Sequence, residues 1–177
     1  MFRGSSFHTI DSKGRIIIPS RFRELVRENG GEGLILSGMD NSLVAYPYTT
    51  WAEVERKILM MAEKSRAMRR FRRVFIGGSS DCPLDRQGRI LVPQSLRQYA
   101  SLNKDIVMVG VLDHFEIWSR DNWDEENRKL EEEDLQEFHG GGAYLVREAC
   151  SGIYKLPWPS RQPLACAEAA RAGLPAG

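Results

Sequence analysis

One pattern of charged, turn-forming and apolar residues occurs twice in this sequence of 177 residues. The copies are Asp11-Ser-Lys-Gly-Arg-Ile-Ile-Ile-Pro-Ser-Arg-Phe-Arg23 and Asp85-Arg-Gln-Gly-Arg-Ile-Leu-Val-Pro-Gln-Ser-Leu-Arg97. Turn geometry explains the repeated aspartate and glycine, and packing explains the apolar run, but neither explains the arginine after each turn. That arginine, Arg15 or Arg89, either pairs with the aspartate of its own turn or offers its guanidinium to a phosphate or a guanine edge.

The residues around each turn add positive charge, which favours the second alternative. They are Lys13, Arg21, Arg23, Arg86 and Arg97. A two-stranded β-ribbon fits the major groove of DNA, so duplicated turns with the same arginine would read adjacent, similar half-sites. In this interpretation Gly14 permits a tight turn and a close approach of the backbone to DNA. Lys13 and Arg86 contact phosphates, which position the protein without reading bases.

The sequence does not support an enzyme. It lacks the H-E-x-x-H, G-x-S-x-G and G-x-x-x-x-G-K-[ST] patterns, and its glycine pairs lack the lysine that a phosphate-binding loop requires. The three histidines are scattered: His8 lies in an expected strand, His114 in an expected turn and His139 further on. The three cysteines form no C-x-x-C pair, so we expect no metal site, no catalytic residue and no cofactor.

Composition is ordinary for a globular chain, and the charge is unevenly distributed. Apolar residues make up 42% and charged residues 28%, with a net charge of +1. Between Arg56 and Arg73 basic residues dominate, and between Asp121 and Glu137 acidic residues dominate. These segments are either two solvated helix faces or, for the basic one, a non-specific phosphate contact. No apolar run approaches membrane-spanning length, and the start resembles no secretory signal, so the expected location is cytoplasmic.

The repeated pattern predicts the same order of elements in both halves. In the first half, a strand over 7–10 and a strand over 15–18 should form a hairpin around the turn. A helix after Pro19 should carry Phe22 and Val26 on its apolar face. Strands over 34–36 and 43–46 should follow, and then a helix capped by Thr49 or Thr50. The second half repeats this order, with Leu96, Tyr99 and Ala100 on its first helix.

The domain organisation follows from the offset of 74 residues between the copies. We expect a first module over 1–63, a basic linker over 64–74 and a second module over 75–133. Residues 134–177 repeat nothing, and their glycine, alanine and proline content is typical of a flexible tail.

The two motifs, together with the Met1-Phe-Arg-Gly start, strongly resemble the MraZ family of bacterial transcriptional regulators, a swapped-hairpin, AbrB-like group. The resemblance covers about residues 1–133 and implies an α+β, mainly β fold. Two tandem modules would interlock into one pseudo-symmetric barrel with flanking helices. It places the family's DNA-contacting arginine on Arg15 and its counterpart on Arg89. Arg3, in the shared start, joins Lys13, Gly14 and Arg86 as a candidate DNA contact.

The resemblance also implies partners. Members of the family assemble into homo-oligomeric rings and bind short repeated elements in double-stranded promoter DNA. These lie upstream of the cell-wall and cell-division gene cluster, which members usually repress. It therefore implies a nucleoid-associated protein without a membrane or small-molecule partner. The alternative is an AbrB-like protein-interaction or scaffold module without operator specificity. The sequence departs from the family at the long tail, and Gln87 stands where the first copy has Lys13.

Overall fold

The computed structural model describes residues 1–29, 31–61 and 65–132, so the predicted tail lies outside the described residues. Met1–Arg128 forms one compact unit. The elements are, in order, β1 (Phe2–Thr9), β2 (Arg15–Ile17), α1 (Ser20–Glu28), β3 (Gly33–Met39), β4 (Ser42–Pro47), α2 (Tyr48–Met60), α3 (Arg66–Phe75), β5 (Ser80–Pro83), β6 (Arg89–Leu91), α4 (Gln94–Tyr99), β7 (Asp105–Leu112), β8 (His114–Ser119) and α5 (Arg120–Glu132). Within the described residues, no helix is both long and apolar enough to span a bilayer.

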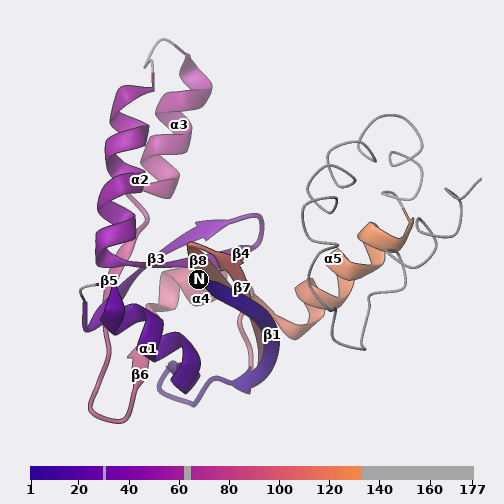
Figure 1. Ribbon diagram of the computed structural model, residues 1–177. Helices are drawn as coiled ribbons and strands as arrows, with labels where there is room; N and C mark the ends of the chain where they lie inside the picture. Colours follow the sequence, from indigo (N-terminus) through magenta and orange to yellow (C-terminus); the bar gives the residue numbers. More distant parts are fainter. Residues whose placement is uncertain (30, 62–64, 133–177) are drawn as a thin grey trace, which may run out of the picture. The chain divides into compact units, whose positions relative to one another are not determined.

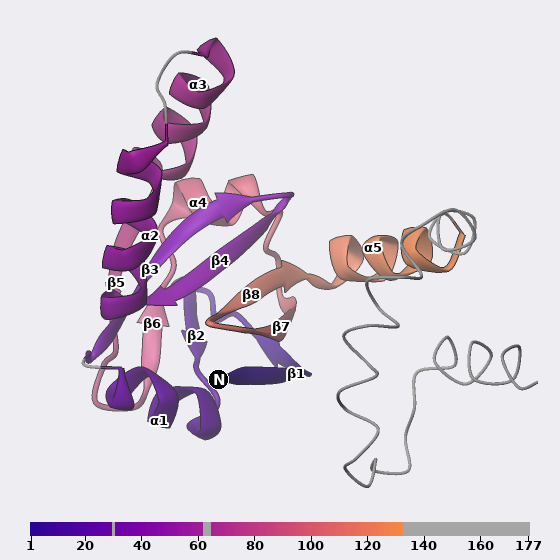
Figure 2. The same ribbon diagram turned by 45° about the horizontal axis from the view of Figure 1, so that its top comes forward.

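The strands of the two halves are interleaved in shared sheets instead of forming separate sheets. The larger sheet is antiparallel with the order β1-β7-β8-β4-β3-β5, and a second sheet pairs β2 with β6. The first strand of each half therefore lies against the third strand of the other half: β1 on β7 and β5 on β3 (Figures 1 and 2). This pairing confirms the α+β, mainly β fold of two tandem, interlocked modules.

The hairpin expected within each half forms only at its tip. Ile10 and Ile16 make an isolated bridge, and the Asp11 N–H donates to the Arg15 carbonyl over 2.9 Å. Beyond that point the chains separate, because β1 pairs with β7 and β2 pairs with β6. Pairing across the halves places Ile16 directly opposite Ile90, and both side chains are buried on the inner face of this ribbon.

The core depends on residues from both halves. Phe2 from β1, Phe22 from α1 and Phe115 from β8 form an aromatic cluster with ring centroids 5.0–5.4 Å apart. All three are at most 2% exposed. Aromatic pairs at this spacing stabilise the fold beyond the area that they bury. The aromatic cluster therefore joins residues of both halves in one core.

A second apolar cluster holds the helical hairpin of α2 and α3 on β3 and β4, and Figures 1 and 2 show these helices side by side. The segment expected to be a linker is thus helical from Arg66. Ser65 caps the helix by accepting from Met68 N over 3.0 Å. Phe75 packs on Trp51, with centroids 5.3 Å apart, and this contact anchors the helix. The boundaries of the two modules stay a prediction.

The first residues of α2 differ from the expected cap. The helix begins at Tyr48 after Pro47, and no side chain caps it. Thr49 instead donates its hydroxyl to the Asn29 carbonyl over 2.5 Å, which ties α2 to the end of α1. The fixed φ of a proline beside the helix start suits entry into the first turn.

Candidate nucleic-acid interface

The two repeated turns have the same backbone geometry. Gly14 N donates to the Asp11 carbonyl and Gly88 N to the Asp85 carbonyl, each over 2.9 Å. Both glycines have positive φ, 81° and 73°, in the left-handed region that other residues rarely adopt. The Asp–x–x–Gly spacing therefore produces a tight turn that places the next residue, an arginine, at the start of a strand.

Each turn aspartate accepts hydrogen bonds through both carboxylate oxygens. Asp11 Oδ1 accepts from the backbone N–H of Lys13 and of Arg15, each over 2.9 Å. Asp11 Oδ2 accepts from Arg15 Nε over 2.7 Å and pairs with Nη2 at 2.7 Å. The second copy repeats this arrangement: Asp85 Oδ1 accepts from the backbone, and Oδ2 pairs with Arg89 Nη2 at 2.7 Å. The internal Asp–Arg pair is therefore present in both copies.

This pair also orients the arginine. In Arg15 the edge formed by Nε and Nη2 faces the carboxylate, so the edge that carries Nη1 is turned away from it. A guanidinium has more N–H donors than one carboxylate oxygen accepts, and a fixed fork suits a phosphate or a guanine. The Arg15 and Arg89 side chains are 32% and 23% exposed, so part of each remains in contact with solvent. Each arginine can therefore pair with the aspartate of its own turn and still offer a guanidinium edge to a phosphate or a guanine.

The outer face of the β2–β6 ribbon carries both arginines. Arg15 lies opposite Leu91, and Ile17 lies opposite Arg89, so these four side chains share the face that points away from the core. Their neighbours on the inner face, Ile16 and Ile90, are buried. The arginines occupy one diagonal of the face, with Cα atoms about 8 Å apart by ordinary strand spacing. We call these four residues the ribbon face.

Two further repeated arginines donate hydrogen bonds to backbone carbonyls beside the ribbon, a role that the sequence did not reveal. Arg23 donates to the Ile18 carbonyl over 3.1 Å, and Arg97 donates to the Val92 carbonyl over 3.2 Å. Each also packs on the turn of the other half: a Cβ built on Gly14 would lie 2.9 Å from Arg97 Cζ. Their occurrence at the end of both motif copies was the only signal in the sequence.

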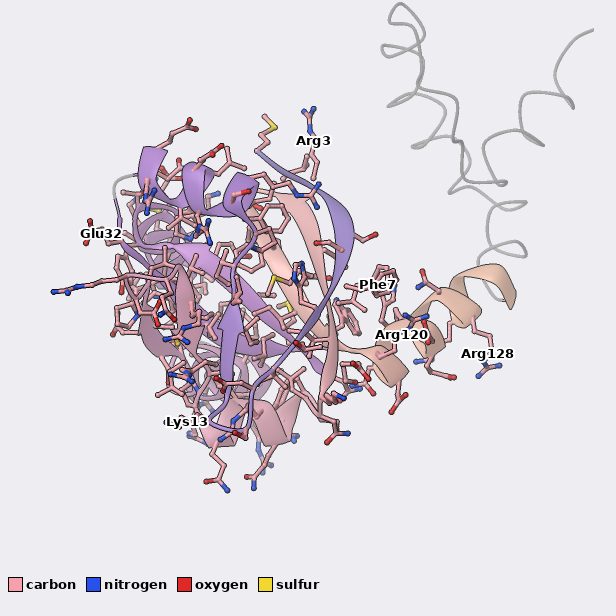
Figure 3. The ribbon with its side chains drawn as sticks, turned by 90° about the horizontal axis from the view of Figure 1, so that it is seen from below. Arg3, Phe7, Lys13, Glu32, Arg120 and Arg128 are labelled. Atoms are coloured by element: carbon pink, nitrogen blue, oxygen red, sulfur yellow. The ribbon has the colours of Figure 1, made fainter. Side chains whose placement is uncertain are left out.

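The other basic candidates do not all lie near the ribbon face. Lys13 and Arg86 are exposed on the two turns, at the ends of the ribbon. Arg21 is exposed on α1, and its guanidinium lies near Gly4 of β1. Figure 3 shows Arg3 and Lys13 at opposite sides of the described core, so Arg3 does not join the turn. Arg3 therefore could contact DNA only at a place separate from the ribbon face.

The remaining titratable candidates show no catalytic arrangement. Cys82 is buried, and burial followed by the nearby charge of Asp81 raises the pKa of its thiol to about 12, so the reactive thiolate is disfavoured. His8 shares a hydrogen bond of 2.9 Å with the Ser6 hydroxyl, and partial burial and then Arg21 lower its pKa. Among the described residues, no cluster of three or more His, Cys, Asp or Glu could hold a metal ion.

The turn carboxylates predict a stability change at acid pH. The backbone N–H of Arg15 and the Arg15 side chain lower the pKa of Asp11 from 3.8, and Arg89 does the same for Asp85. A lowered pKa in the folded state means that the stabilisation is present above the unfolded-state pKa and disappears as the pH falls through the folded-state pKa. The melting temperature should therefore fall below pH 3.8 less steeply in an Asp11→Asn/Asp85→Asn variant than in the wild type.

The matched control for this experiment is Asp81→Asn/Asp121→Asn, which removes two negative charges from residues outside the turns. Circular dichroism melts between pH 2.5 and 7 supply the comparison. If the melting temperatures of the wild type and the turn variant fell equally below pH 3.8, the two carboxylates would not stabilise the folded turns.

Both halves of the sequence match the same protein family. The sequence matches the family described as "MraZ protein, putative antitoxin-like" over residues 1–74 and again over 75–139. It is similar to the "Transcriptional regulator MraZ" of Desulforapulum autotrophicum, with 56% identity over 133 residues that cover 75% of this chain and 90% of that protein. The protein of the same name from Desulfosudis oleivorans is 48% identical over 77% of this chain and 92% of its own length.

Among solved structures, "The solution structure of PHS018 from pyrococcus horikoshii" covers 66% of this chain and 96% of that one. Its sequence identity is 16% and its TM-score 0.30, which is too low to support an argument about fold or function.

Proposed function

The chain belongs to the MraZ family, a non-enzymatic family whose curated members are named transcriptional regulators, and from this premise we propose that it is a DNA-binding transcriptional regulator. The observation that carries the proposal is the ribbon face, where two arginines related by the internal repeat are each oriented by an aspartate. A preoriented guanidinium loses less freedom on binding than an unrestrained one, which favours specific contact with a base edge.

The finer parts of the proposal come from the resemblance. The protein would bind short repeated elements upstream of its own gene, in the cell-wall and cell-division gene cluster, and usually repress it. Several copies in a homo-oligomeric ring would engage several repeats at once. Linked binding raises the effective concentration of each further contact, so a small ribbon face suffices for tight overall binding. Association with the nucleoid follows from this mode of binding.

The roles of the basic turn residues predict separate effects on affinity and selectivity. Lys13 and Arg86 are exposed on the two turns, where they would contact phosphates. Replacing either with alanine should weaken binding to all sequences about equally and reduce the slope of log affinity against log salt by about 1. Fluorescence anisotropy titrations at several salt concentrations measure this slope. A loss of selectivity, with the slope unchanged, would assign base contact to these residues.

A second candidate function has support of its own. Leu59 and Met60, adjacent near the end of α2, are 75% and 76% exposed, and a protein partner would explain such exposure if they belong to a contiguous apolar patch. The chain could then be an interaction module of the AbrB-like type, without operator specificity.

A mobility-shift titration at two salt concentrations separates the two candidates. It compares the DNA upstream of the chain's own gene with a scrambled duplex of equal length and composition. The proposed regulator binds the upstream DNA selectively, and its affinity falls steeply as salt rises because phosphate contacts release counterions. Failure of the folded protein to distinguish the two duplexes would favour the interaction module.

A further inference from the structure

The ribbon face contains two exposed aliphatic side chains that stability does not explain. Ile17 and Leu91 are 56% and 58% exposed, although the residues beside them in the same strands, Ile16 and Ile90, are almost completely buried. Isolated exposed apolar residues are common and need no special explanation. Here, however, the two residues occupy equivalent positions of the internal repeat and share one face with Arg15 and Arg89.

The strand register pairs each arginine with one aliphatic residue. Leu91 lies directly opposite Arg15, and Ile17 lies directly opposite Arg89. Side chains opposite each other in an antiparallel pair have Cβ atoms about 5 Å apart. Successive bases of one DNA strand are about 3.4 Å apart, so two side chains at this separation can contact the same base pair or adjacent base pairs.

We propose that Ile17 and Leu91 read thymine methyl groups in the major groove, next to the bases that Arg15 and Arg89 contact. The inference rests on the proposed function. The thymine methyl group is the apolar feature of the major groove, and aliphatic side chains contact it. The arginine would then recognise one base by hydrogen bonds, and the aliphatic side chain would recognise a nearby thymine by apolar contact with its methyl group.

The surroundings of Ile17 favour DNA over a small apolar ligand. Ile17 also borders a groove of about 510 Å³ lined by Phe7, Asp105 and Arg120, and Figure 3 shows the ring of Phe7 beside Arg120. The Arg120 guanidinium lies 4.5 Å from the centre of that ring. A ligand confined to this groove would contact Ile17 but not Leu91. A duplex across the ribbon contacts Ile17 and Leu91 together, and the exposed basic turns at both ends carry the charge that its phosphates attract.

The test removes the methyl group from the DNA instead of altering the protein first. Footprinting locates the bound segment in the DNA upstream of the chain's own gene, and thymines within it are replaced one at a time by deoxyuridine. Burying one methyl group contributes about 0.8 kcal/mol. Replacing a thymine that contacts Ile17 or Leu91 should therefore weaken binding of the wild-type protein about fourfold.

Protein variants then assign the effect to the ribbon face. In Ile17→Ala/Leu91→Ala the affinity difference between thymine and deoxyuridine should disappear, whereas Ile17→Val should retain most of it. Leu59→Ala, which removes an exposed apolar residue from α2, is the matched control and should behave as the wild type does. Circular dichroism melts of all variants verify that they are folded.

The outcomes separate this inference from the proposed function. Selective binding that ignores deoxyuridine at every position would overturn the methyl contact and leave the DNA-binding function intact. A methyl effect of the same size in the wild type and in Ile17→Ala/Leu91→Ala would also overturn it, because another residue would then contact the methyl group. If the wild type bound no DNA selectively, the proposed function and the methyl contact would both be rejected.

Discussion

Replacing Arg15 with alanine is expected to weaken selective binding by a factor of about 5 to 150 for each engaged DNA site. The basis is the loss of a bidentate contact to a base edge, which contributes about 1–3 kcal/mol of discrimination. Arg89→Ala should have a similar effect, since Arg89 holds the equivalent place on the ribbon face and makes the same pair with its turn aspartate. Mobility-shift titrations with selective and scrambled duplexes measure both effects.

The same variant should remain folded. The Asp11–Arg15 ion pair is partly exposed, and such pairs contribute only about 0–1 kcal/mol to stability. The turn also retains the two hydrogen bonds from the backbone to Asp11 Oδ1. Arg15→Lys keeps the charge but loses the fork, so it should retain non-specific binding and lose selectivity. Arg66→Ala, which removes an exposed arginine of α3, is the charge-matched control.

Three results would contradict this role for Arg15. Unfolding of Arg15→Ala would mean that the Asp–Arg pair serves the fold and that binding data on this variant are uninformative. Unchanged selective binding by a folded Arg15→Ala protein would place the base-reading residue elsewhere. Non-selective binding lost equally in Arg15→Ala and Arg66→Ala would indicate that only total charge matters.

Replacing Phe115 with alanine is expected to lower the free energy of unfolding by about 3–5 kcal/mol. Phe115 is 0% exposed, and its ring contacts the rings of Phe2 and Phe22, which come from the first half of the chain. Because β1 and β5 each pair with a strand of the opposite half, both halves should unfold in a single transition in the wild type and in the variant.

Urea denaturation followed by tryptophan fluorescence and by far-ultraviolet circular dichroism measures this effect. Tryptophan fluorescence reports on both halves, because Trp51 lies in the first half and Trp118 in the second. Val74→Ala, at a side chain of α3 that is 49% exposed, is the control and should change stability little. Two transitions at different urea concentrations would show that the halves are independent domains, contrary to the interlocked strand pairing.

Local patterns in the sequence predicted the elements better than their partners. Apolar periodicity located α1, β3 and β4, because a helix or strand that buries one face must repeat at its own period. The same pattern suggested that residues 7–10 and 15–18 would pair with each other, since a turn lies between them. Periodicity says which face of a strand is buried and not which strand lies beside it. The exchange of partners between halves came only from the family resemblance.

The candidate site was predictable in composition but not in geometry. Duplication of the motif singled out Arg15 and Arg89, yet left open whether each pairs with its aspartate or faces outward. The structure shows the pair and an edge of each guanidinium turned away from it. The run Ile16-Ile-Ile18 is apolar throughout, so it does not indicate that Ile17 points outward. Residues 64–74 were interpreted as a basic linker because arginines dominate them, whereas the structure places most of them in α3, whose buried residue is Phe75.

Site-directed photo-crosslinking shows where DNA lies without depending on any loss of affinity. A photoreactive amino acid replaces Ser12 or Gln87, which are exposed on the two turns, or Leu59, which is exposed on α2. The labelled DNA comes from the region upstream of the chain's own gene. If the ribbon face and its turns contact DNA, positions 12 and 87 will crosslink to the duplex and position 59 will not. Crosslinking at position 59 without crosslinking at either turn would show that DNA binds elsewhere.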